Sequence, residues 1–299
     1  MKLVFFNDFT LGVLKNGNVV DVSEAVRDVP HVTPQDLMSG VIAGFASLRS
    51  RIEEVADKSA GVPVDQVRLR PPLPKPTHMV AMAANYLEFG ARRENPPTIN
   101  AFLKASSSVI GPGDTIVLPP AKADVFHHEA ELGVVIGKEA AHVKEADAYD
   151  YIFGYVNFID ACARGLGRGS FYWGKSWDTF GPMGPCIVTA DEVPDPMNLV
   201  VQLRVNGKIR HLYPTLDMAY DIPRCLEWSS GIVSLEPGDI IAMGTNHQGI
   251  GAIQDGDLIE MEIEGLEKLV VHVKDDLKRE WPRSVDHAFA DRVAGRTPR

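Results

Sequence analysis

The segment from Phe126 to Lys138 contains the apolar run Leu132-Gly133-Val134-Val135-Ile136. A run rich in β-branched residues and bounded by glycine predicts a buried strand. Because side chains alternate between the two faces of a strand, Glu129 and Glu131 should project together, with Leu132 on the opposite face. The rest of the chain is organised around this predicted strand.

The same reasoning predicts a strand-rich region after residue 70. Buried or half-buried strands are expected at 79–84, 115–118, 151–159, 186–189, 199–205, 208–210, 240–243 and 258–263. Helices are expected at 140–148 and 222–230. The segment Gly181–Pro185 predicts a rigid turn that leads into the strand at 186–189.

The first seventy residues predict a separate small unit. Short strands are expected at 2–6, 10–14 and 19–22, with a hairpin turn at 15–18, and residues 41–56 have helical periodicity. A proline-rich connector at 70–76 cannot be helical and indicates a domain boundary. We therefore expect a small N-terminal β domain at 1–70, a catalytic domain at 71–281 and a charged, loosely held C-terminal tail at 282–299.

Composition narrows the classes of function. The chain has 299 residues, a formal net charge of −10 and a pI near 5.4, which argue against nucleic acid or an anionic membrane as the partner. No apolar run approaches membrane-spanning length. The glycine-rich loop at 244–251 lacks the lysine of a phosphate-binding loop. Three widely separated cysteines indicate reduced thiols and a cytoplasmic location rather than a disulfide framework.

Two carboxylates on one face of a buried strand repel each other and lose hydration, so a compensating group is expected. A hard divalent cation suits Glu129 and Glu131, although a half-exposed strand edge with two solvated glutamates has the same E-x-E pattern. Asp160 ends the strand at 151–159, where it could join them or cap a following helix. Lys175 lies between aromatic residues, where it either contacts an anion or carbonyl or extends to the surface.

Several motifs then occur together in one order. They are Phe126 to Lys138, Gly154-Tyr155 to Asp160, Gly174-Lys175-Ser176, Gly184-Pro185, Val205-Asn206-Gly207, and Pro237-Gly238-Asp239 to Gly244-Thr245. With this order and spacing, over about residues 68–276, the chain resembles the fumarylacetoacetate hydrolase family, and within it the acylpyruvase and oxaloacetate decarboxylase branch. The resemblance implies a mixed α/β, strand-rich fold with an open β-barrel or β-roll core, a small N-terminal β domain and a homodimer.

The resemblance also implies the residues of the site. Glu129, Glu131 and Asp160 fall where the family binds Mg²⁺ or Mn²⁺, and Ca²⁺ could substitute in a crystal. Strand alternation puts His127 on the face of the glutamates, where it could orient a ligand. The residues expected to serve catalysis are Lys175, His127 and Thr245. Those expected to contact the substrate are Arg92, Glu88, Lys104, Arg164, Thr245 and Asn246.

One departure from the family concerns the proton acceptor. Hydrolytic relatives carry a histidine four residues after the position of Asn85 and a glutamate three further, but this chain has Phe89 and Arg92 there. A phenyl ring cannot accept a proton and a guanidinium stays protonated. The base must then come from elsewhere, namely the metal or a neighbour such as His127, His247 or Glu88. Arg92 would grip a distal substrate carboxylate, or else pair with Glu88 on a solvated helix face.

A second departure follows Arg164. Relatives often have Asp next and Gln two positions on, whereas this chain has Gly165 and Gly167. The usual Gly-Thr-Pro is likewise replaced by Gly244-Thr245-Asn246, followed by His247. These changes leave the substrate open.

Three functions remain open at this point. The first is a metal-dependent hydrolase that cleaves a C–C bond in an acylpyruvate-like 2-oxo acid, as in the catabolism of aromatic compounds, with water activated at the metal. The second keeps the metal but decarboxylates, tautomerises or hydrates a 2-oxo acid. The third is an inactive relative that binds a ligand, and the retained metal ligands argue against it. The expected partner is a small 2-oxo acid.

Overall fold

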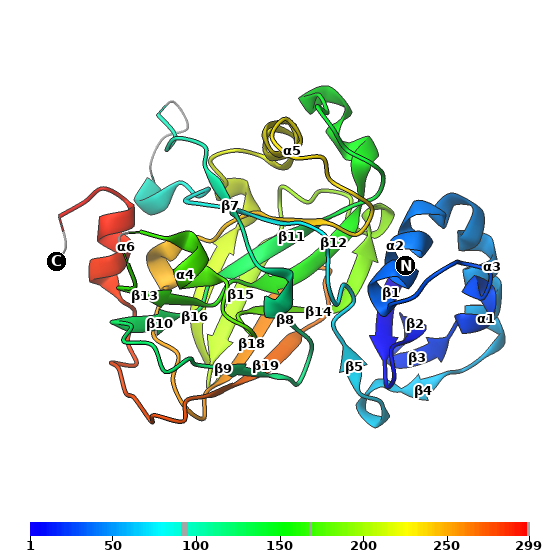
Figure 1. The fold of residues 1–299 in the computed structure, drawn as a ribbon, viewed down its shortest axis with the longest axis horizontal. Coiled ribbons are helices and arrows are strands. Elements are labelled where there is room, and N and C mark those ends of the chain that lie inside the picture. The colour runs from blue at the N-terminus through cyan, green and yellow to red at the C-terminus, as the bar shows by residue number, and fades with distance from the viewer. Residues whose placement is uncertain (91–94, 168, 298–299) are drawn as a thin grey trace.

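The computed structural model describes residues 1–90, 95–167 and 169–297. A 12-stranded sheet runs across the molecule (Figure 1). In spatial order its strands are β4 (Val62–Pro63), β3 (Asn18–Asp21), β2 (Thr10–Lys15), β1 (Lys2–Phe6), β14 (Gly181–Thr189), β12 (Ile152–Ile159), β11 (Ala130–Ile136), β17 (Ile240–Ala242), β6 (Met79–Met82) and β7 (Ala101–Leu103). Beside them, β5 (Leu69–Arg70) pairs with β1, and β8 (Val109–Ile110) pairs with β14.

A second sheet packs against this central sheet. Its strands are β16 (Lys208–Pro214), β15 (Val200–Val205), β18 (Leu258–Ile263), β19 (Leu269–Lys274) and β9 (Thr115–Val117). Leu203 and Met261 of the second sheet share a hydrophobic core with Leu132 and Val134 of β11. A two-stranded ribbon joins β10 (Val125–His127) to β13 (Cys162–Arg164). The mixed, strand-rich fold is confirmed, but the described strands close no barrel, so the predicted barrel or roll is not.

Strand β11 is buried on both faces because alternate side chains enter different cores. Leu132 and Val134 enter the core between the sheets. Val135 enters a second core together with Met38 and Val41 of the N-terminal unit. The buried strand predicted from the apolar run is confirmed, but it begins at Ala130 instead of Phe126 because the chain leaves regular pairing at residues 128 and 129.

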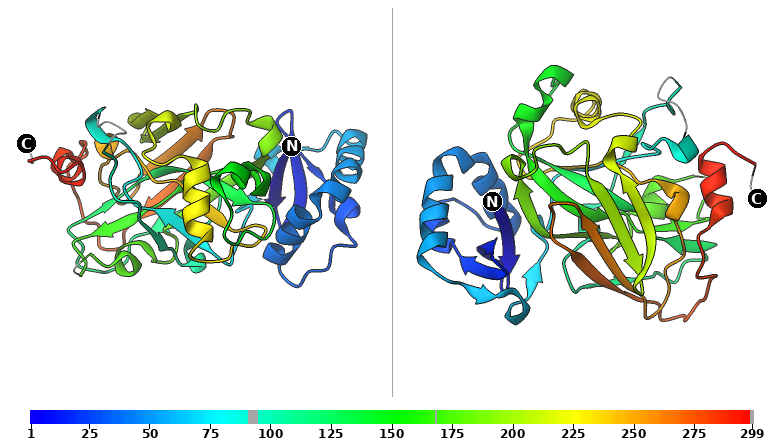
Figure 2. Two further views of the ribbon diagram at one scale, coloured as in Figure 1. Left: turned by 90° about the horizontal axis from the view of Figure 1, so that it is seen from above. Right: turned by 180° about the vertical axis from the view of Figure 1, so that it is seen from behind.

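The N-terminal unit is joined to the central sheet by strand pairing. Its helices are α1 (Ser23–Val26), α2 (Pro34–Ala43) and α3 (Phe45–Lys58). Strand β1 pairs antiparallel with β14, with Leu3 opposite Ile187, so the blue unit in Figure 2 continues the sheet of the larger body. The helix predicted at 41–56 is wrong in its extent, because Gly44 ends α2 and starts α3. The boundary near residue 70 stays a prediction.

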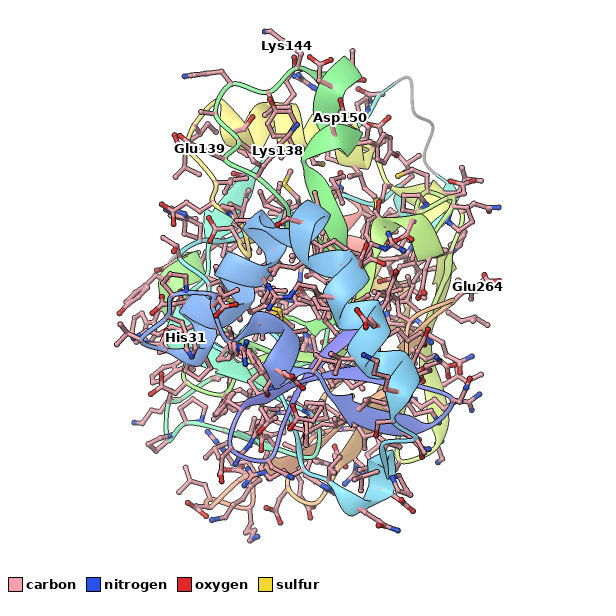
Figure 3. The ribbon with its side chains drawn as sticks, turned by 90° about the vertical axis from the view of Figure 1, so that its right-hand side faces the viewer. His31, Lys138, Glu139, Lys144, Asp150 and Glu264 are labelled. Atoms are coloured by element: carbon pink, nitrogen blue, oxygen red, sulfur yellow. The ribbon has the colours of Figure 1, made fainter. Side chains whose placement is uncertain are left out.

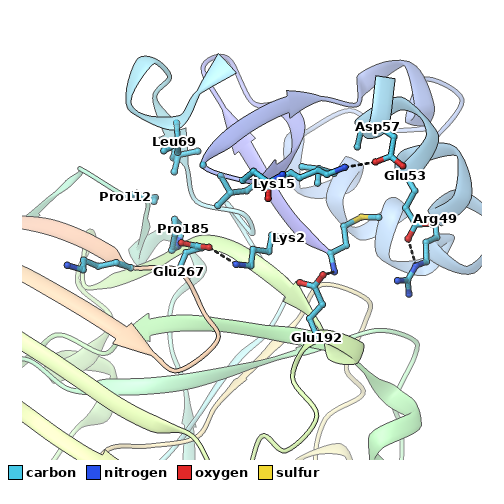
Figure 4. Close-up of a pocket in the computed structure, with 18 of the residues that line it drawn as sticks. Lys2, Lys15, Arg49, Glu53, Asp57, Leu69, Pro112, Pro185, Glu192 and Glu267 are labelled. Carbon is cyan, nitrogen blue, oxygen red and sulfur yellow. Dashed lines mark hydrogen bonds and ion pairs between the residues drawn. The ribbon is translucent and has the colours of Figure 1, made fainter. Parts of the chain in front are cut away.

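The hollow beside this junction is lined by apolar side chains and by paired charges (Figure 4). It has a volume of about 680 Å³. Lys2 Nζ lies 2.5 Å from Glu267 Oε1, and Lys15 Nζ lies 2.5 Å from Asp57 Oδ1. None of the three predicted metal ligands lines this hollow. The candidate chemistry therefore lies elsewhere.

Two local predictions need correction. Residues 140–148 are not the single helix expected: residues 145–148 belong to a 3₁₀ turn, but His142 has a φ of 52°, and the backbone N–H groups of Ala140 and His142 bond to Leu235 and Ser230. The exposed side chains of Lys138, Glu139 and Lys144 lie along this irregular segment, at one edge of the molecule (Figure 3). The predicted turn Gly181–Pro185 is instead part of strand β14. The pairing of β14 with β12 shifts register beside Gly184, so the irregular backbone there does not end the strand.

The remaining helices are short. They are α4 (Phe171–Lys175), α5 (Ile222–Ser230) and α6 (His287–Val293), with 3₁₀ turns η1 (Val64–Gln66), η2 (Glu88–Gly90), η3 (Ser106–Ser108), η4 (Glu145–Tyr151), η5 (Ala190–Glu192), η6 (Thr215–Asp217) and η7 (His247–Gly249). The helix predicted at 222–230 is confirmed. No helix among the described residues is long and apolar enough to cross a membrane.

The C-terminal segment is ordered where a loose tail was expected. Asp286 caps α6 by accepting a hydrogen bond from the Phe289 N–H at 2.9 Å, which satisfies one free donor of the first turn. The Asp286 N–H donates to the carbonyl of Ile250 at 2.8 Å, and Gly251 pairs with Val285. Helix α6 lies at the end of the molecule opposite the N-terminal unit (Figure 1). Residues 286–293 of the expected tail thus form a capped helix, and the boundary at residue 282 stays a prediction.

Candidate metal and active site

Three carboxylates meet where β11 and β12 lie side by side. Glu131 lies within β11, Glu129 just before it, and Asp160 just after β12. The pairing of Ala130 with Ile159, and the hydrogen bond from the Asp160 N–H to the Glu129 carbonyl at 3.0 Å, bring the segments together. All three side chains are buried, and their candidate ligand oxygens lie within 4.8 Å of one another. The structure thus brings the predicted metal ligands together.

Three cationic side chains contact two of these carboxylates. Lys175 Nζ lies 2.7 Å from Glu129 Oε2 and also contacts Asp160. Lys104 Nζ lies 2.6 Å from Asp160 Oδ1, and the Arg164 guanidinium contacts Glu129. Burial disfavours the charged amine of Lys175, but Asp160 and Glu129 outweigh it and raise its pKa. Burial lowers the pKa of Lys104, which Asp160 opposes.

Glu131 differs from its two neighbours in that the described residues give it no cationic partner in hydrogen-bond contact. It accepts a hydrogen bond from the Gly244 N–H at 2.8 Å. Burial, together with the charges of Asp160 and Glu129, raises its pKa well above the ordinary value of a glutamate. An all-oxygen donor set with one poorly compensated carboxyl group is what a hard divalent cation would stabilise. The residues present therefore fit Mg²⁺ or Mn²⁺.

The glycine loop after β17 forms another wall. Gly244 has a φ of 83°, which favours glycine at the point where the chain leaves the strand. The Thr245 hydroxyl lies 3.1 Å from the hydroxyl of Tyr213. The Asn246 side chain accepts from the Gln248 N–H at 2.9 Å and so caps η7. Thr245 and Asn246 thus support the loop, and their predicted contacts with substrate stay predictions.

A histidine and a glutamate meet at this loop. His247 Nδ1 lies 2.8 Å from Glu88 Oε1, and the backbone N–H of His247 donates to the same oxygen at 2.8 Å. On its other side, His247 Nε2 lies 4.0 Å from Glu129 Oε1. Both residues were expected from the sequence as alternative bases, but their pairing was not expected, because 159 positions separate them.

His127 is held between Arg164 and the C-terminal helix. Arg164 Nε donates to His127 Nδ1 at 3.4 Å, and Asp286 Oδ2 lies 3.2 Å from His127 Nε2. Burial and the nearby Arg164 guanidinium lower the pKa of His127 to about 3. The Phe289 ring packs over the Arg164 guanidinium at 4.2 Å. Asp286 and Phe289 were missed by the sequence analysis, although an aspartate before a short helical pattern is a helix-start signal.

The two departures from the family pattern have different surroundings. Phe89 has a φ of 51°, and its ring lies 4.3 Å from the Arg296 guanidinium carbon. Arg92 lies outside the described residues, so its predicted grip on a substrate stays a prediction. Gly165 lines a hollow of about 160 Å³ beside Arg164. A Cβ on Gly165 would lie 2.2 Å from an Asp124 carboxylate oxygen, and its φ of 78° also favours glycine at this position.

Comparison with known proteins decides the family. A model of the fumarylacetoacetate hydrolase C-terminal region matches residues 78–274, which is more than half of the chain. The chain belongs to the fumarylacetoacetate hydrolase family. The resemblance drawn from the motifs is confirmed.

Members of this family that are similar along most of the chain have named activities. The maleylpyruvate hydrolase of Aquipseudomonas alcaligenes is 32% identical over 289 residues, covering 92% of this chain and 99% of that protein. The mitochondrial oxaloacetate tautomerase of Bos taurus is 34% identical over 264 residues, covering 84% of this chain and 82% of that protein. The family therefore includes both a hydrolase and a tautomerase at similar distance from this chain.

A solved structure extends the comparison to the metal. The maleylpyruvate hydrolase of Sphingobium sp. SYK-6, crystallised with manganese(II) and pyruvate, superimposes with a TM-score of 0.83 at 35% identity. The alignment covers 92% of this chain and 99% of that one. A manganese ion and a 2-oxo acid thus occur together in a protein of this fold.

Proposed function

We propose that this protein is a divalent-metal-dependent hydrolase that cleaves the C–C bond of an acylpyruvate-like 2-oxo acid. The observation that carries the proposal is the buried cluster of Glu129, Glu131 and Asp160, with ligand oxygens within 4.8 Å of one another. The similarity to a hydrolase crystallised with manganese(II) and pyruvate supports both the metal and the substrate class. Either Mg²⁺ or Mn²⁺ suits the oxygen ligands.

The charges of the site favour an anionic substrate. The charges of Lys104, Lys175 and Arg164 balance those of the three carboxylates, so a bound divalent cation would add two positive charges to this group of residues. A 2-oxo acid supplies a carboxylate to neutralise part of this charge. When bound, the cation would polarise the 2-oxo group and stabilise negative charge on an enolate.

The protein's own side chains hold this arrangement. Lys175 and Lys104 keep Asp160 and Glu129 oriented through short charge-assisted hydrogen bonds. Arg164 lines the small hollow and retains some exposure, so it is the side chain best placed to meet a second substrate carboxylate. The contact of Lys175 with both carboxylates supports its predicted catalytic role. His127, with neighbours at both ring nitrogens, suits a positioning role for Arg164.

The overall reaction consumes one water. Water adds to the distal carbonyl carbon of R–CO–CH₂–CO–COO⁻, and the bond from that carbon to the CH₂ group breaks. The bonding electrons leave on the CH₂ carbon as the enolate of pyruvate, which takes up a proton. The products are a carboxylic acid and pyruvate, so atoms and electrons balance without a redox partner.

Tautomerisation of a 2-oxo acid is the second candidate, since a tautomerase of the family is 34% identical to this chain. It requires proton transfer at the CH₂ carbon but no water. Decarboxylation, hydration and simple ligand binding have no observation of their own in favour.

The homodimer also stays a prediction. Strand β16 exposes Ile209 and Leu212, and light scattering would measure the mass of the protein in solution.

The test is a substrate panel assayed on chelated and metal-loaded protein. It should include maleylpyruvate, simple acylpyruvates and both tautomers of oxaloacetate, each with EDTA, Mg²⁺ or Mn²⁺. Loss of the diketo absorbance with equimolar pyruvate supports hydrolysis. Conversion of the oxaloacetate tautomers without pyruvate would support the second candidate, and activity that survives exhaustive chelation would contradict a metal-dependent reaction of either kind.

A further inference from the structure

We propose that His247 is the general base of this site and that Glu88 is the residue that positions it; this rests on the hydrolase function proposed above. Glu88 is buried, and its Oε1 atom accepts from the His247 backbone N–H and contacts Nδ1, both at 2.8 Å. Because a carboxylate only accepts hydrogen bonds, Nδ1 carries the proton and Nε2 keeps its lone pair. Nε2 is the ring nitrogen on the side of Glu129, at 4.0 Å.

Other groups around the carboxylates are poorer proton acceptors. Lys104, Lys175 and Arg164 are cations engaged with Asp160 or Glu129. The buried Cys162 thiol already donates to Glu129 Oε1 at 3.6 Å. None of these side chains offers a free lone pair to a water molecule.

Each of the other buried histidines differs from His247 in its contacts. His127 accepts from Arg164 and lies beside Asp286. His128 Nδ1 and His211 Nε2 face each other at 3.0 Å, and neither ring pairs with a carboxylate among the described residues. Among the described histidines, His247 is the one that combines an orienting carboxylate with a second nitrogen directed at the carboxylate cluster.

A separate observation points to a polar ligand at the same place. Glu88 Oε2 is buried and has no hydrogen-bond partner among the described residues. A buried carboxylate oxygen without a donor is costly unless water or a ligand supplies one. The distance from His247 Nε2 to Glu129 Oε1, 4.0 Å, is also too long for a direct hydrogen bond and suits a bridging molecule.

The fold holds this pair in place through neighbouring polar contacts. The Asn85 side chain donates to the Met243 carbonyl at 3.0 Å and accepts from the Tyr220 N–H at 2.9 Å, which ties the start of η2 to the end of β17. At η7, a Cβ on Gly249 would lie 1.8 Å from the Arg210 carbonyl oxygen, so the turn packs directly on β16. A base held this firmly loses little freedom on reaction.

The proposed step is a single proton transfer in each direction. His247 Nε2 removes a proton from water as the water oxygen bonds to the distal carbonyl carbon of the substrate. The bond to the CH₂ group then breaks, and its electrons form the enolate of pyruvate. The imidazolium of His247 then gives its proton to the CH₂ carbon of the enolate. Glu88 stabilises the positive charge of the imidazolium between the two proton transfers.

The test compares the full chain with His247→Gln, His247→Ala and Glu88→Gln at saturating Mn²⁺, using an acylpyruvate cleaved by the wild type. Loss of a general base should lower kcat about 10²- to 10⁴-fold, and Glu88→Gln should lower it about 10- to 100-fold. KM should stay within about threefold. Calorimetric affinities for Mn²⁺ and for oxalate, an enolate mimic, should be unchanged, and added imidazole should restore part of the His247→Ala rate.

The matched control is His78→Gln. His78 Nδ1 contacts the Asp239 carboxylate at 2.9 Å, so it forms a similar pair, but at the start of β17 and away from Gly244. Its kcat should equal that of the wild type. Variants of His247 that keep the wild-type kcat, or that lose Mn²⁺ affinity in step with kcat, would overturn the inference while wild-type hydrolysis stands. A wild type unable to cleave any acylpyruvate would refute the proposed function, and the assigned base with it.

Discussion

Replacing Glu131 by glutamine separates the cost of a buried carboxyl group from its use as a metal ligand. Glutamine keeps the size of the side chain and can still accept the hydrogen bond from the Gly244 N–H. Its amide group can donate to the nearby carboxylates of Asp160 or Glu129, whose charges act on Glu131 in the wild type. The substitution therefore removes one ionisable group with little change in packing.

For the metal-free protein, the raised pKa of Glu131 decides whether the free energy of unfolding rises or falls with pH. Its reference value is 4.5, and burial with the two neighbouring carboxylates moves it well above that. As the pH rises, the Glu131 carboxyl group loses its proton at a lower pH in the unfolded chain than in the folded one. The contribution of Glu131 to the free energy of unfolding is therefore fully present below pH 4.5, and it is lost as the pH rises toward the folded pKa. Each pH unit in that window costs about 1.4 kcal/mol of unfolding free energy.

Between pH 5 and pH 7 the wild type should therefore lose up to about 2.7 kcal/mol that the glutamine variant keeps. At roughly 2 °C per kcal/mol for a large domain, metal-free Glu131→Gln should unfold above metal-free wild type at pH 7, by up to about 5 °C. The gap should shrink toward pH 5. With Mn²⁺ at about 100 times its Kd, the wild type should gain about 2.7 kcal/mol and the variant nothing.

The assay is calorimetric unfolding of chelated protein across this pH range, with and without Mn²⁺. Glu264→Gln is the control, since Glu264 is exposed on another face (Figure 3); it should match the wild type in both conditions. The reasoning fails if metal-free Glu131→Gln unfolds below the wild type at pH 7. It fails equally if Mn²⁺ stabilises both proteins to the same extent.

Three further outcomes test other parts of the site. Exhaustive chelation should abolish turnover, and Mg²⁺ or Mn²⁺ should restore it; steady-state assays that find full activity after chelation would contradict the metal site. Phe289→Ala should lower kcat/KM about fivefold, because it removes a cation–π contact to Arg164 worth about 1 kcal/mol. Phe289→Leu keeps the apolar cover but has no ring, so it should lower kcat/KM as much. Wild-type kinetics in both variants would refute a role of the Phe289 ring in holding Arg164. Gly249→Ala should lower both Tm and kcat, because the added carbon would lie 1.8 Å from the Arg210 carbonyl oxygen and η7 must move; unchanged kcat with a lower Tm would show that the turn does not position His247.

The metal ligands could be predicted from the sequence because they depend on local geometry. Alternation along one strand placed Glu129 and Glu131 on a common side, and Asp160 followed an apolar run long enough to be a strand. One pairing of β11 with β12 then brings all three together. The prediction failed in detail at residues 128 and 129, where the chain leaves regular pairing, because no local pattern marks that break.

The surrounding residues depend on tertiary contacts that no short pattern contains. The pair of Glu88 and His247 joins two turns 159 positions apart. Helix α6 is a charged segment with few apolar side chains, so its sequence resembles that of a free tail. It packs on the site because Phe289 contacts Arg164 and Asp286 contacts His127. The helix predicted at 41–56 had the right periodicity, but Gly44 divided it. Periodicity predicts the face of an element better than its ends.

The direction of neighbouring side chains links the altered lid to the proposed base. Phe89 has a positive φ and turns its ring toward Arg296, with 36% of its surface exposed, while Glu88 just before it is 8% exposed and reaches His247. A histidine placed at position 89 with this backbone would therefore point toward Arg296. The buried residue is the one before it, and its carboxylate is engaged with His247, where it can orient a base. His247 then supplies the imidazole from the opposite wall, so the replacement of the lid pair and the presence of His247 in the glycine loop are two parts of one arrangement.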